Sequence, residues 1–415
     1  MLRILASSKT SCRAHRPVQP KQALQLQQRR GHADDAKADG AQHAAARPSM
    51  RTEAHARCAA SDQAVARRRL PHVPAAITQP RYVDIDAIRR SYAPATWNRI
   101  SLADPLLMSF QARGIGNFVR PAGAGNLNTA VDTVVNAKRL MLCTGFNVER
   151  DTPETDGPVG VAILAHACWR ADKQVVVVAD ELNAHLVREA LHILDPDCLK
   201  HIAIETVPAA RPADMHALQA IFDRHQVDAM VHTEVPGRNT DGAYLNMRGI
   251  PISDFNAPLD ELMNLANARL MDTVGVGDGG NEAGMGGLGG VPPALNGLDM
   301  QAVVPAAHQV IAWNSNLGAI ALGEFVLAAA GKGVSCTPAA FENVVRKMFS
   351  ERAVDGVTRQ GALDARVENP ALPRHYNYTC VDGVRSAVHI GNLLQLQDIA
   401  HNVPLHWPTS GNKNF

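Results

Sequence analysis

A run of four valines constrains the fold of this chain more than any other feature. Residues 174–179 have the sequence QVVVVA. The valines do not alternate with polar residues, so a strand formed here would be buried on both faces. Such strands are typical of parallel sheets that helices cover on both sides. Because parallel neighbours need crossover connections, the flanking sequence should alternate between strands and helices.

The sequence on either side of the valine run does alternate in this way. Strands are predicted at 139–144, 202–207, 228–234 and 309–313, and helices at 158–171, 181–194, 213–225, 316–330 and 338–352. Asn316 is the expected cap of the helix that runs to residue 330, and residues 376–401 mix a strand with a helix. The predicted fold class is α/β, with three layers and a mostly parallel sheet that carries helices on both faces.

The first eighty residues differ from the rest of the chain. Residues 1–80 carry 14 Lys and Arg against 5 Asp and Glu, whereas residues 81–415 carry 27 basic and 35 acidic residues. No apolar period is sustained in residues 1–80, so they lack the pattern of a packed core. We expect them to be disordered, as a transit peptide or as an extension from a misassigned start codon. Residues 81–415 are expected to form one α/β domain.

Charge, hydropathy and cysteine usage exclude several classes of protein. The acidic body argues against a nucleic-acid partner, which would select for clustered Lys and Arg. No stretch approaches the ~18 apolar residues of a membrane span. The seven scattered cysteines indicate a reducing compartment. The cytoplasm is therefore expected, with the mitochondrial matrix as the alternative, and the sequence leaves open whether the chain forms a homodimer.

Polar loops follow two of the predicted strands, those at 139–144 and 228–234. Ligands of such sheets bind outside the carboxyl ends of the strands. After the strand at 139–144 come Thr144 and Gly145, and then Glu154 and Asp156 directly ahead of a helix. Two carboxylates at a helix start either cap the helix or bind a cation.

The second polar loop begins after Val231, toward the end of the strand predicted at 228–234. It places His232, Glu234, Arg238 and Asp241 within ten residues. An imidazole, a guanidinium and two carboxylates at this density indicate a functional site rather than a plain connection. For His232 taken alone, a packed histidine and a catalytic one remain equally open.

The third loop, residues 275–290, contains nine glycines in sixteen positions. Glycine is needed where backbone approaches another group closely or takes a positive φ. Asp278, Asn281 and Glu282 stand among these glycines, so the loop is able to bind an anion with its amides or a divalent cation with its carboxylates.

The glycine-rich loop also fits the dinucleotide-binding pattern in a formal sense. Residues 275–280 satisfy G-x-G-x-x-G, and Asp299 follows at a suitable distance. That fingerprint requires a strong strand before it and a helix that begins at its third glycine. Here more glycine follows, and then Pro292 and Pro293, which a helix would not tolerate. No nucleotide cofactor is expected.

Four segments of the chain resemble, in chain order, segments of the D-glutamate cyclase family, in its C-terminal cyclase domain. They are residues 144–146 (TGF) with 154–158 (ETDGP), 237–246 (GRNTDGAYLN), 275–286 (GVGDGGNEAGMG) and 312–318 (AWNSNLG). The resemblance covers roughly residues 85–400, and GDGGNE is its most specific element. It implies the dehydration of D-glutamate to 5-oxo-D-proline by a hydro-lyase. The resemblance is to one domain of the vertebrate mitochondrial enzyme, and no counterpart of the further N-terminal domain of that enzyme is expected in this chain.

The implied reaction assigns roles to the polar residues of these loops. The α-amine must lose a proton and the γ-carboxylate must be neutralised before a lactam closes. His232 or Glu234 is the candidate base, Arg238 the clamp for the α-carboxylate, and Asp241 a further catalytic residue. The candidate ligands of a divalent cation, Mg²⁺ or Mn²⁺, are Asp278, Glu282, Glu154 and Asp156. The candidate substrate-binding residues are Thr144, Gly145, Gly277, Gly279, Gly280, Asn281 and Asn314.

Two other functions remain open from the residues alone. Acidic strand-end loops beside a glycine-rich loop also suit a Mg²⁺- or Mn²⁺-dependent phosphohydrolase. A protein that binds a small molecule without converting it would show the same residues, and ligand would then raise its thermal stability with no turnover.

Overall fold

The computed structural model describes residues 94–110, 112–357 and 380–402, and the predictions for residues 1–80 lie outside this part. A six-stranded sheet forms its centre, in the order β5-β4-β1-β6-β7-β8, and every neighbouring pair is parallel. The strands are β1 (Arg139–Thr144), β4 (Gln174–Ala179), β5 (Ala203–Thr206), β6 (Ala229–Thr233), β7 (Asp272–Gly277) and β8 (His308–Ile311).

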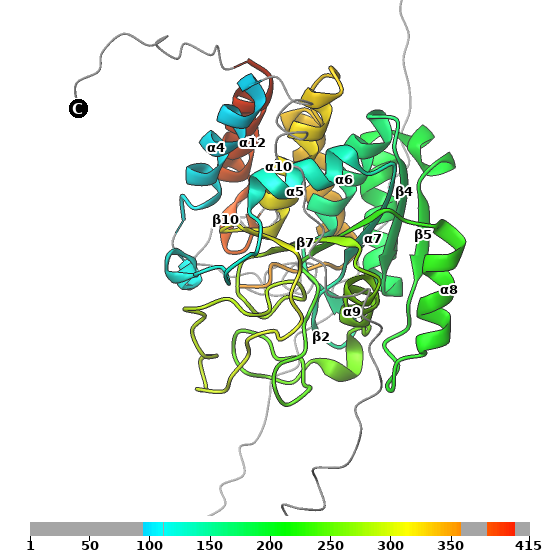
Figure 1. Ribbon diagram of the computed structural model, residues 1–415, viewed down its shortest axis with the longest axis vertical. Coiled ribbons are helices and arrows are strands. Elements are labelled where there is room, and N and C mark those ends of the chain that lie inside the picture. The colour runs from blue at the N-terminus through cyan, green and yellow to red at the C-terminus, as the bar shows by residue number, and fades with distance from the viewer. Residues whose placement is uncertain (1–93, 111, 358–379, 403–415) are drawn as a thin grey trace, which may run out of the picture. The chain divides into compact units, whose positions relative to one another are not determined.

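Helices and short hairpins complete the described part (Figure 1). The α-helices are α4 (Pro94–Leu107), α5 (Leu127–Asn136), α6 (Pro158–Arg170), α7 (Glu181–Leu194), α8 (Met215–His225), α9 (Asp260–Ala268), α10 (Ser315–Ala329), α11 (Pro338–Ser350) and α12 (Ser386–Gln397). The shorter helical turns are η2 (Ala112–Asn117), η3 (Pro196–Lys200), η4 (Ser253–Phe255) and η7 (Asp398–Asn402). Two small hairpins pair β2 (Asn147–Glu149) with β3 (Thr152–Pro153) and β9 (Cys380–Val381) with β10 (Val384–Arg385).

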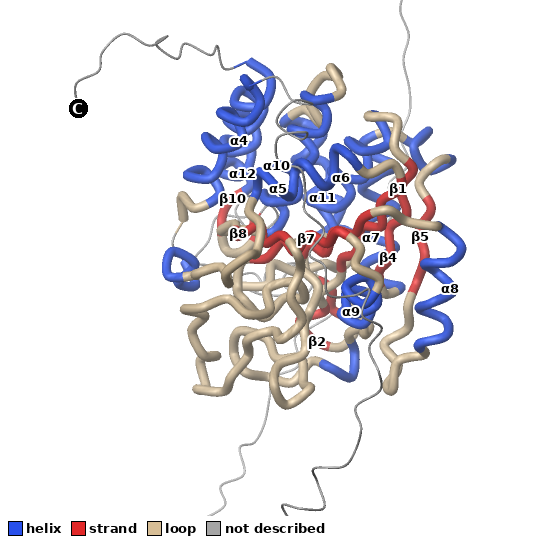
Figure 2. The backbone as a smooth tube through the Cα atoms, in the orientation of Figure 1, coloured by secondary structure: helices blue, strands red, loops and turns tan. Residues whose placement is uncertain are grey.

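The two faces of the sheet bury different sets of side chains. Leu140 and Leu142 of β1 belong to the core that includes α5, α6 and α10, whereas Met141 and Cys143 belong to the core that includes α8 and α9. Successive side chains of a strand point to opposite faces, so both faces are covered. Figure 2 shows α5, α6 and α10 on one side of the strands and α9 on the other. The predicted three-layer α/β class is confirmed.

The start of α10 differs from the prediction. Its N-cap is Asn314, whose side chain accepts a hydrogen bond from the backbone N–H of Leu317. Asn316 lies inside the helix instead, and its Oδ1 accepts the backbone N–H groups of Gly157 and Gly160 in and before α6. Asn316 therefore ties α10 to the start of α6, and the prediction that it caps its own helix was wrong.

A strand, β7, precedes the glycine-rich loop and was not among the predicted strands. β7 has the sequence DTVGVG, and its glycines hide the β-branched signal. An added Cβ on Gly275 would lie 2.8 Å from the Cα of Gly284, so the loop folds back onto the strand here. No helix begins at Gly280, as expected, and the loop continues as turns and extended chain.

The strand order places a ligand crevice at a defined point. Numbered along the chain, the six strands of the sheet occur in the order third, second, first, fourth, fifth, sixth. The connections run in opposite directions from β1 and β6, and such a reversal opens a crevice at the carboxyl ends of these two strands. Thr144 and Thr233 are the last residues of β1 and β6. None of the described helices is long and apolar enough to cross a membrane.

The contact between α6 and α10 gives a test of the packing. An added Cβ on Gly160 would lie 2.6 Å from the Cα of Asn316, so Gly160→Ala is expected to lower the free energy of unfolding by about 1–3 kcal/mol. Gly391→Ala is the matched control, because Gly391 lies in α12 with no heavy atom within 4 Å of the added Cβ. It should raise stability by about 0.4–1 kcal/mol. Urea unfolding followed by tryptophan fluorescence measures both, and equal midpoints would contradict the close crossing.

Candidate active site

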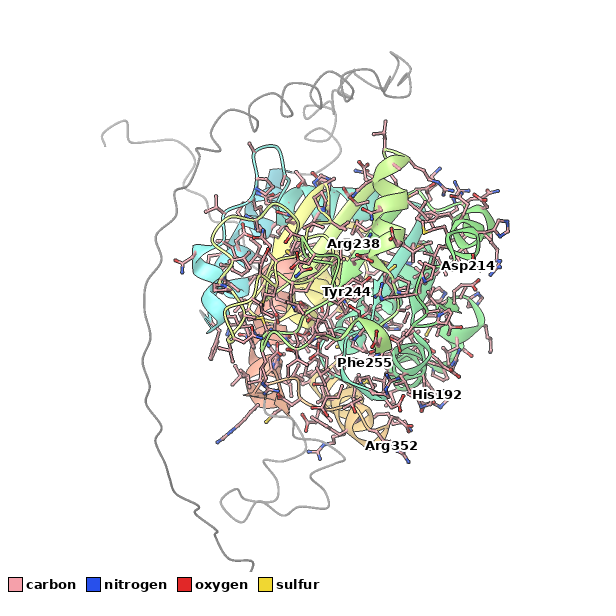
Figure 3. The ribbon with its side chains drawn as sticks, turned by 90° about the horizontal axis from the view of Figure 1, so that it is seen from below. His192, Asp214, Arg238, Tyr244, Phe255 and Arg352 are labelled. Carbon is pink, nitrogen blue, oxygen red and sulfur yellow. The ribbon has the colours of Figure 1, made fainter. Side chains whose placement is uncertain are left out.

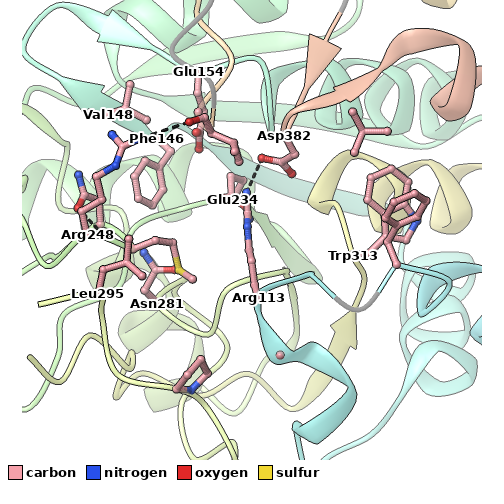
Figure 4. A pocket seen from close by; sticks show the side chains of 18 of the residues that line it. Arg113, Phe146, Val148, Glu154, Glu234, Arg248, Asn281, Leu295, Trp313 and Asp382 are labelled. Carbon is pink, nitrogen blue, oxygen red and sulfur yellow. Dashed lines mark hydrogen bonds and ion pairs between the residues drawn. The ribbon is translucent and has the colours of Figure 1, made fainter. Parts of the chain in front are cut away.

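A cavity of about 560 Å³ lies at the carboxyl edge of the sheet. Glu234 follows β6, Asn281 follows β7 and Trp313 follows β8, and all three line the cavity. Arg113 from η2 and Asp382 from the β9–β10 turn complete its polar end (Figure 4). Loops that follow separate strands therefore converge on one cavity. The segments of Arg113 and Asp382, which lie toward the two ends of the described chain, also contribute to it.

Buried carboxylates gather around Asp278 at this edge. Asp278 belongs to one group with Asp156 and Asp382 and to a second with Glu234 and Glu282. In each group the carboxylate oxygens lie within 4.8 Å of one another. Carboxylates this close repel one another, so bound protons or cations are needed to hold them together in the folded protein. Either group is able to bind a metal ion.

Arg113 is the cation that the structure places in this cluster. Its guanidinium forms ion pairs with Asp278 and with Asp382, the second with an N–O distance of 2.6 Å. Figure 4 shows Arg113 pointing at Asp382. Its backbone has a φ of 65°, an uncommon value for a residue with a side chain. Burial by itself raises the pKa of Asp382, but Arg113 and the hydrogen bonds of its side chain together outweigh burial, so the pKa is lowered below the usual range.

Asp156 joins the starts of two helices. Its two oxygens accept hydrogen bonds from the backbone N–H groups of Gly157, Ser315 and Asn316 and from the side chain of Asn314. Burial raises the pKa of Asp156, and the neighbouring carboxylates add to this rise. With four donors on two oxygens, Asp156 holds α6 and α10 together at the edge of the site.

Glu282 holds the glycine-rich loop in shape. Its carboxylate accepts the backbone N–H groups of Asp278, Gly279 and Gly280 at 3.0, 2.7 and 2.7 Å. Gly280 has a φ of 86°, which favours glycine. An added Cβ on Gly277 would lie 2.8 Å from the Glu282 carboxylate. The glycines thus let the backbone wrap around one carboxylate, and that loop presents Asp278 to the cluster.

Asp278 retains a free oxygen within the cluster. Its Oδ1 binds Arg113, but its Oδ2 is buried and has no hydrogen-bond partner among the described residues. Burial raises the pKa of Asp278 well above its usual range, and Arg113 only partly opposes this. A buried carboxylate oxygen without a partner is costly, so a proton or a metal ion fits this position.

Glu234 is the carboxyl group best placed for proton transfer. It lines the cavity, and its Oε2 accepts a hydrogen bond of 2.5 Å from the Ser315 hydroxyl. Burial raises its pKa well above the usual range, and Asp278, Glu282 and Glu154 raise it further. Its φ is 50°, a left-handed conformation that is found at functional sites. A carboxyl group with a raised pKa is a stronger base when ionised and keeps its proton to higher pH, which suits general acid–base catalysis.

Three other residues predicted to be catalytic lie away from the cavity lining. His232 is fully buried in β6, and burial lowers its pKa to about 3. Arg238 forms ion pairs with Asp260 and Glu261 of α9. Asp241 is exposed on its loop. The structure therefore places Glu234 beside Asp278 and Glu282. The other three residues predicted to be catalytic do not lie at this cluster of carboxylates.

The region around Arg238 forms a separate structural network. Asp260 accepts hydrogen bonds from both Arg238 and the hydroxyl of Tyr244, and Figure 3 labels these two residues. The guanidinium of Arg211 lies 4.2 Å from the centroid of the Tyr244 ring. These contacts fix the loop after β6 against α9.

The remaining predicted residues lie at the strand ends or at the cavity. Glu154 and Asn281 line the cavity, and the Asn281 side chain donates to the backbone of Leu245 at 2.9 Å. Thr144 is buried, and its hydroxyl has no partner among the described residues. Gly145 has a φ of 140° and packs closely on Asp180. Asn314 donates to Asp382 as well as to Asp156, at 2.8 Å each.

Arg113 and Asp382 are the site residues that the sequence did not reveal. Asp382 and Gly383 have φ values of 54° and 72° and connect β9 to β10. An Asp-Gly pair is a hairpin signal, which accounts for both residues without any function. Arg113 belongs to no motif, and it is 165 residues from Asp278 and 269 from Asp382 in the chain. Only the folded structure shows them together.

Comparison with known proteins identifies relatives of this chain. Residues 102–365 match the family described as D-glutamate cyclase-like, C-terminal. The mitochondrial D-glutamate cyclase of Homo sapiens is 30% identical over an alignment of 226 residues, and the match covers 51% of this chain and 35% of that protein. The match therefore spans about a third of the length of the human relative.

Proposed function

Because the chain belongs to the D-glutamate cyclase-like, C-terminal family, we propose that it converts D-glutamate to 5-oxo-D-proline with loss of water, as a hydro-lyase. The observation that carries the proposal is Glu234, a carboxyl group with a raised pKa in the wall of a cavity at the crevice of the sheet. The family membership supports the reaction class, and the human relative supports the substrate.

The proposed reaction requires two proton transfers and a neutralised carboxylate. The bond from the α-nitrogen to the γ-carbon forms, and a bond from that carbon to an oxygen breaks. Two protons leave the ammonium group and depart with that oxygen as water. Glu234 is the group that takes a proton from the amine and returns it to the leaving oxygen, because it lines the cavity and burial raises its pKa.

A divalent cation fits the donor set of the site. The free Oδ2 of Asp278 lies in a group of carboxylate oxygens, and hard cations such as Mg²⁺ and Mn²⁺ prefer such ligands. Asp278 would hold the ion with Asp382 or Glu234, since the oxygens of Asp156 and Glu282 already accept backbone N–H groups. The bound ion would polarise the γ-carboxyl group and neutralise the charge of the cluster.

The proposal is tested by analysing the product with chiral mass spectrometry. The full chain is incubated with D- or L-glutamate, in EDTA and after addition of Mn²⁺ or Mg²⁺. We expect 5-oxo-D-proline from D-glutamate, with EDTA lowering the rate at least about tenfold and the metal restoring it. Asp278→Asn should lose the response to metal. The absence of 5-oxoproline under every metal condition would refute the proposed reaction.

The cellular location and assembly also remain proposals. We propose the cytoplasm, with the mitochondrial matrix as the alternative because the human relative is described as mitochondrial. The proposed partner is a small amino acid rather than a nucleic acid, and light scattering would decide between a monomer and a homodimer.

A further inference from the structure

The mouth of the cavity carries apolar side chains that free glutamate has no group to contact. Phe110, Leu295 and Val357 line the cavity and are 43%, 85% and 45% exposed. Large apolar side chains that gather around a pocket while exposed to water indicate a ligand-binding surface. The two methylene groups of glutamate connect its reacting ends, so neither extends toward the mouth.

An aromatic pair lines another part of the cavity, with Trp313 on the other side of Arg113 from Leu295 (Figure 4). The ring centroids of Phe110 and Trp313 lie 5.1 Å apart, and Trp313 is only 4% exposed (Figure 4). Val384 of β10 lines the same cavity. Aromatic faces of this kind favour aryl and alkyl groups, because they bury a large apolar area with few torsions to fix. The cavity therefore has an apolar compartment beside its acidic end.

The acidic end favours a ligand whose γ-carbonyl group is uncharged. Glu154, Glu234 and Asp382 line this end, and Arg113 already binds Asp278 and Asp382. A carboxylate on the ligand would lie among like charges there, whereas an amide or ester carbonyl adds no charge. The α-ammonium group of the ligand is attracted by the same carboxylates.

We infer that the cavity also accepts γ-amides and γ-esters of D-glutamate with apolar amines or alcohols, and releases the apolar group by cyclisation. The inference rests on the proposed function, because it uses the same nucleophile and the same carbonyl carbon. The bond from the α-nitrogen to the γ-carbon forms, and the bond from that carbon to the leaving nitrogen or oxygen breaks. The ammonium group loses two protons, of which one ends on the leaving atom and the other is released to solvent.

The experiment compares two amides that differ in the apolar group alone. The full chain is incubated with γ-D-glutamyl benzylamide, γ-D-glutamyl methylamide and D-glutamate, and 5-oxoproline and released amine are measured by mass spectrometry. Benzylamine is the weaker base and therefore the better leaving group, so only the part of the kcat/KM difference that Leu295→Asp removes reports contacts with the ring. We expect kcat/KM to be at least about tenfold higher for the benzylamide.

Variants at the mouth assign this preference to the cavity. Leu295→Asp should lower kcat/KM for the benzylamide about tenfold and narrow its advantage over the methylamide. Leu270→Asp is the matched control. Leu270 is also an exposed leucine, at 60%, but it lies just ahead of β7 at the opposite edge of the sheet. This control should leave the preference unchanged.

The outcomes separate this inference from the proposed function. Equal kcat/KM for the two amides, or a preference that Leu295→Asp does not alter, would overturn the inference. If D-glutamate is cyclised and neither amide reacts, the inference fails and the proposed function stands. If the amides are cyclised and D-glutamate is not, the inference stands and the proposed function fails.

Discussion

Glu234→Gln is expected to lower kcat for the cyclisation of D-glutamate by about a thousandfold. The amide keeps the shape of the side chain and the contact with the Ser315 hydroxyl, but it is unable to accept or donate the proton that the reaction moves. The rate of 5-oxoproline formation measures the effect. Glu181→Gln, at an exposed position in the first turn of α7, is the control and should keep the wild-type rate.

Glu234→Gln should also stabilise the fold relative to wild type, and this gain should grow as pH rises. Folding raises the pKa of Glu234 above the unfolded value, near 4.5. Its contribution to stability is therefore fully present below that value and is lost as pH rises through the raised pKa. The Gln variant lacks this loss, so its Tm relative to wild type should increase from pH 5 to pH 8 in EDTA.

The kinetic prediction for Glu234→Gln has its own contradicting outcome. A kcat of this variant within about tenfold of wild type would show that Glu234 does not transfer the proton.

Arg113→Met is expected to lower the free energy of unfolding at pH 7 by about 3–5 kcal/mol. The substitution leaves Asp278 and Asp382 buried without their cation. Methionine and arginine meet the same backbone strain at a φ of 65°, so the comparison isolates the charge. Urea unfolding measures the loss, and Arg113→Lys, which keeps a positive charge, should lose less.

The loss of stability in Arg113→Met should depend on pH, and the pKa shift of Asp382 gives the direction of that dependence. Arg113 lowers the pKa of Asp382 below its usual range. The resulting stability is present above the unfolded pKa, near 3.8, and is lost as pH falls through the lower, folded value. The difference between wild type and Arg113→Met should therefore be largest near neutral pH and shrink toward pH 3. A difference that stays constant over this range would show that the ion pairs do not stabilise the fold.

The sequence predicted those elements whose pattern is local. β4 is a continuous apolar run, and α7 has an Asp180 cap and a clear apolar face, so both were found with their bounds. β7 was missed because its glycines replace the β-branched residues that mark a strand. α5 and α9 were also missed, because both are short, with 10 and 9 residues.

The candidate site was predictable only where motif and strand end coincide. Asp278 and Glu234 follow adjacent parallel strands, so the topology alone brings them to one edge. Arg238 and Asp241 are in the same loop as Glu234, yet the loop turns away and Arg238 pairs with α9. Proximity in sequence does not determine the direction of a side chain in an irregular loop. That direction depends on contacts between residues far apart in the sequence, such as the ion pairs of Arg113 with Asp278 and Asp382.

The most direct test of this account is a crystal structure of the full chain with 5-oxo-D-proline. The account predicts that the lactam lies in the cavity, within hydrogen-bond distance of the Glu234 carboxyl group and beside the ring of Trp313. A lactam bound elsewhere, or a structure in which Glu234 and Asp278 do not share one cavity, would contradict it.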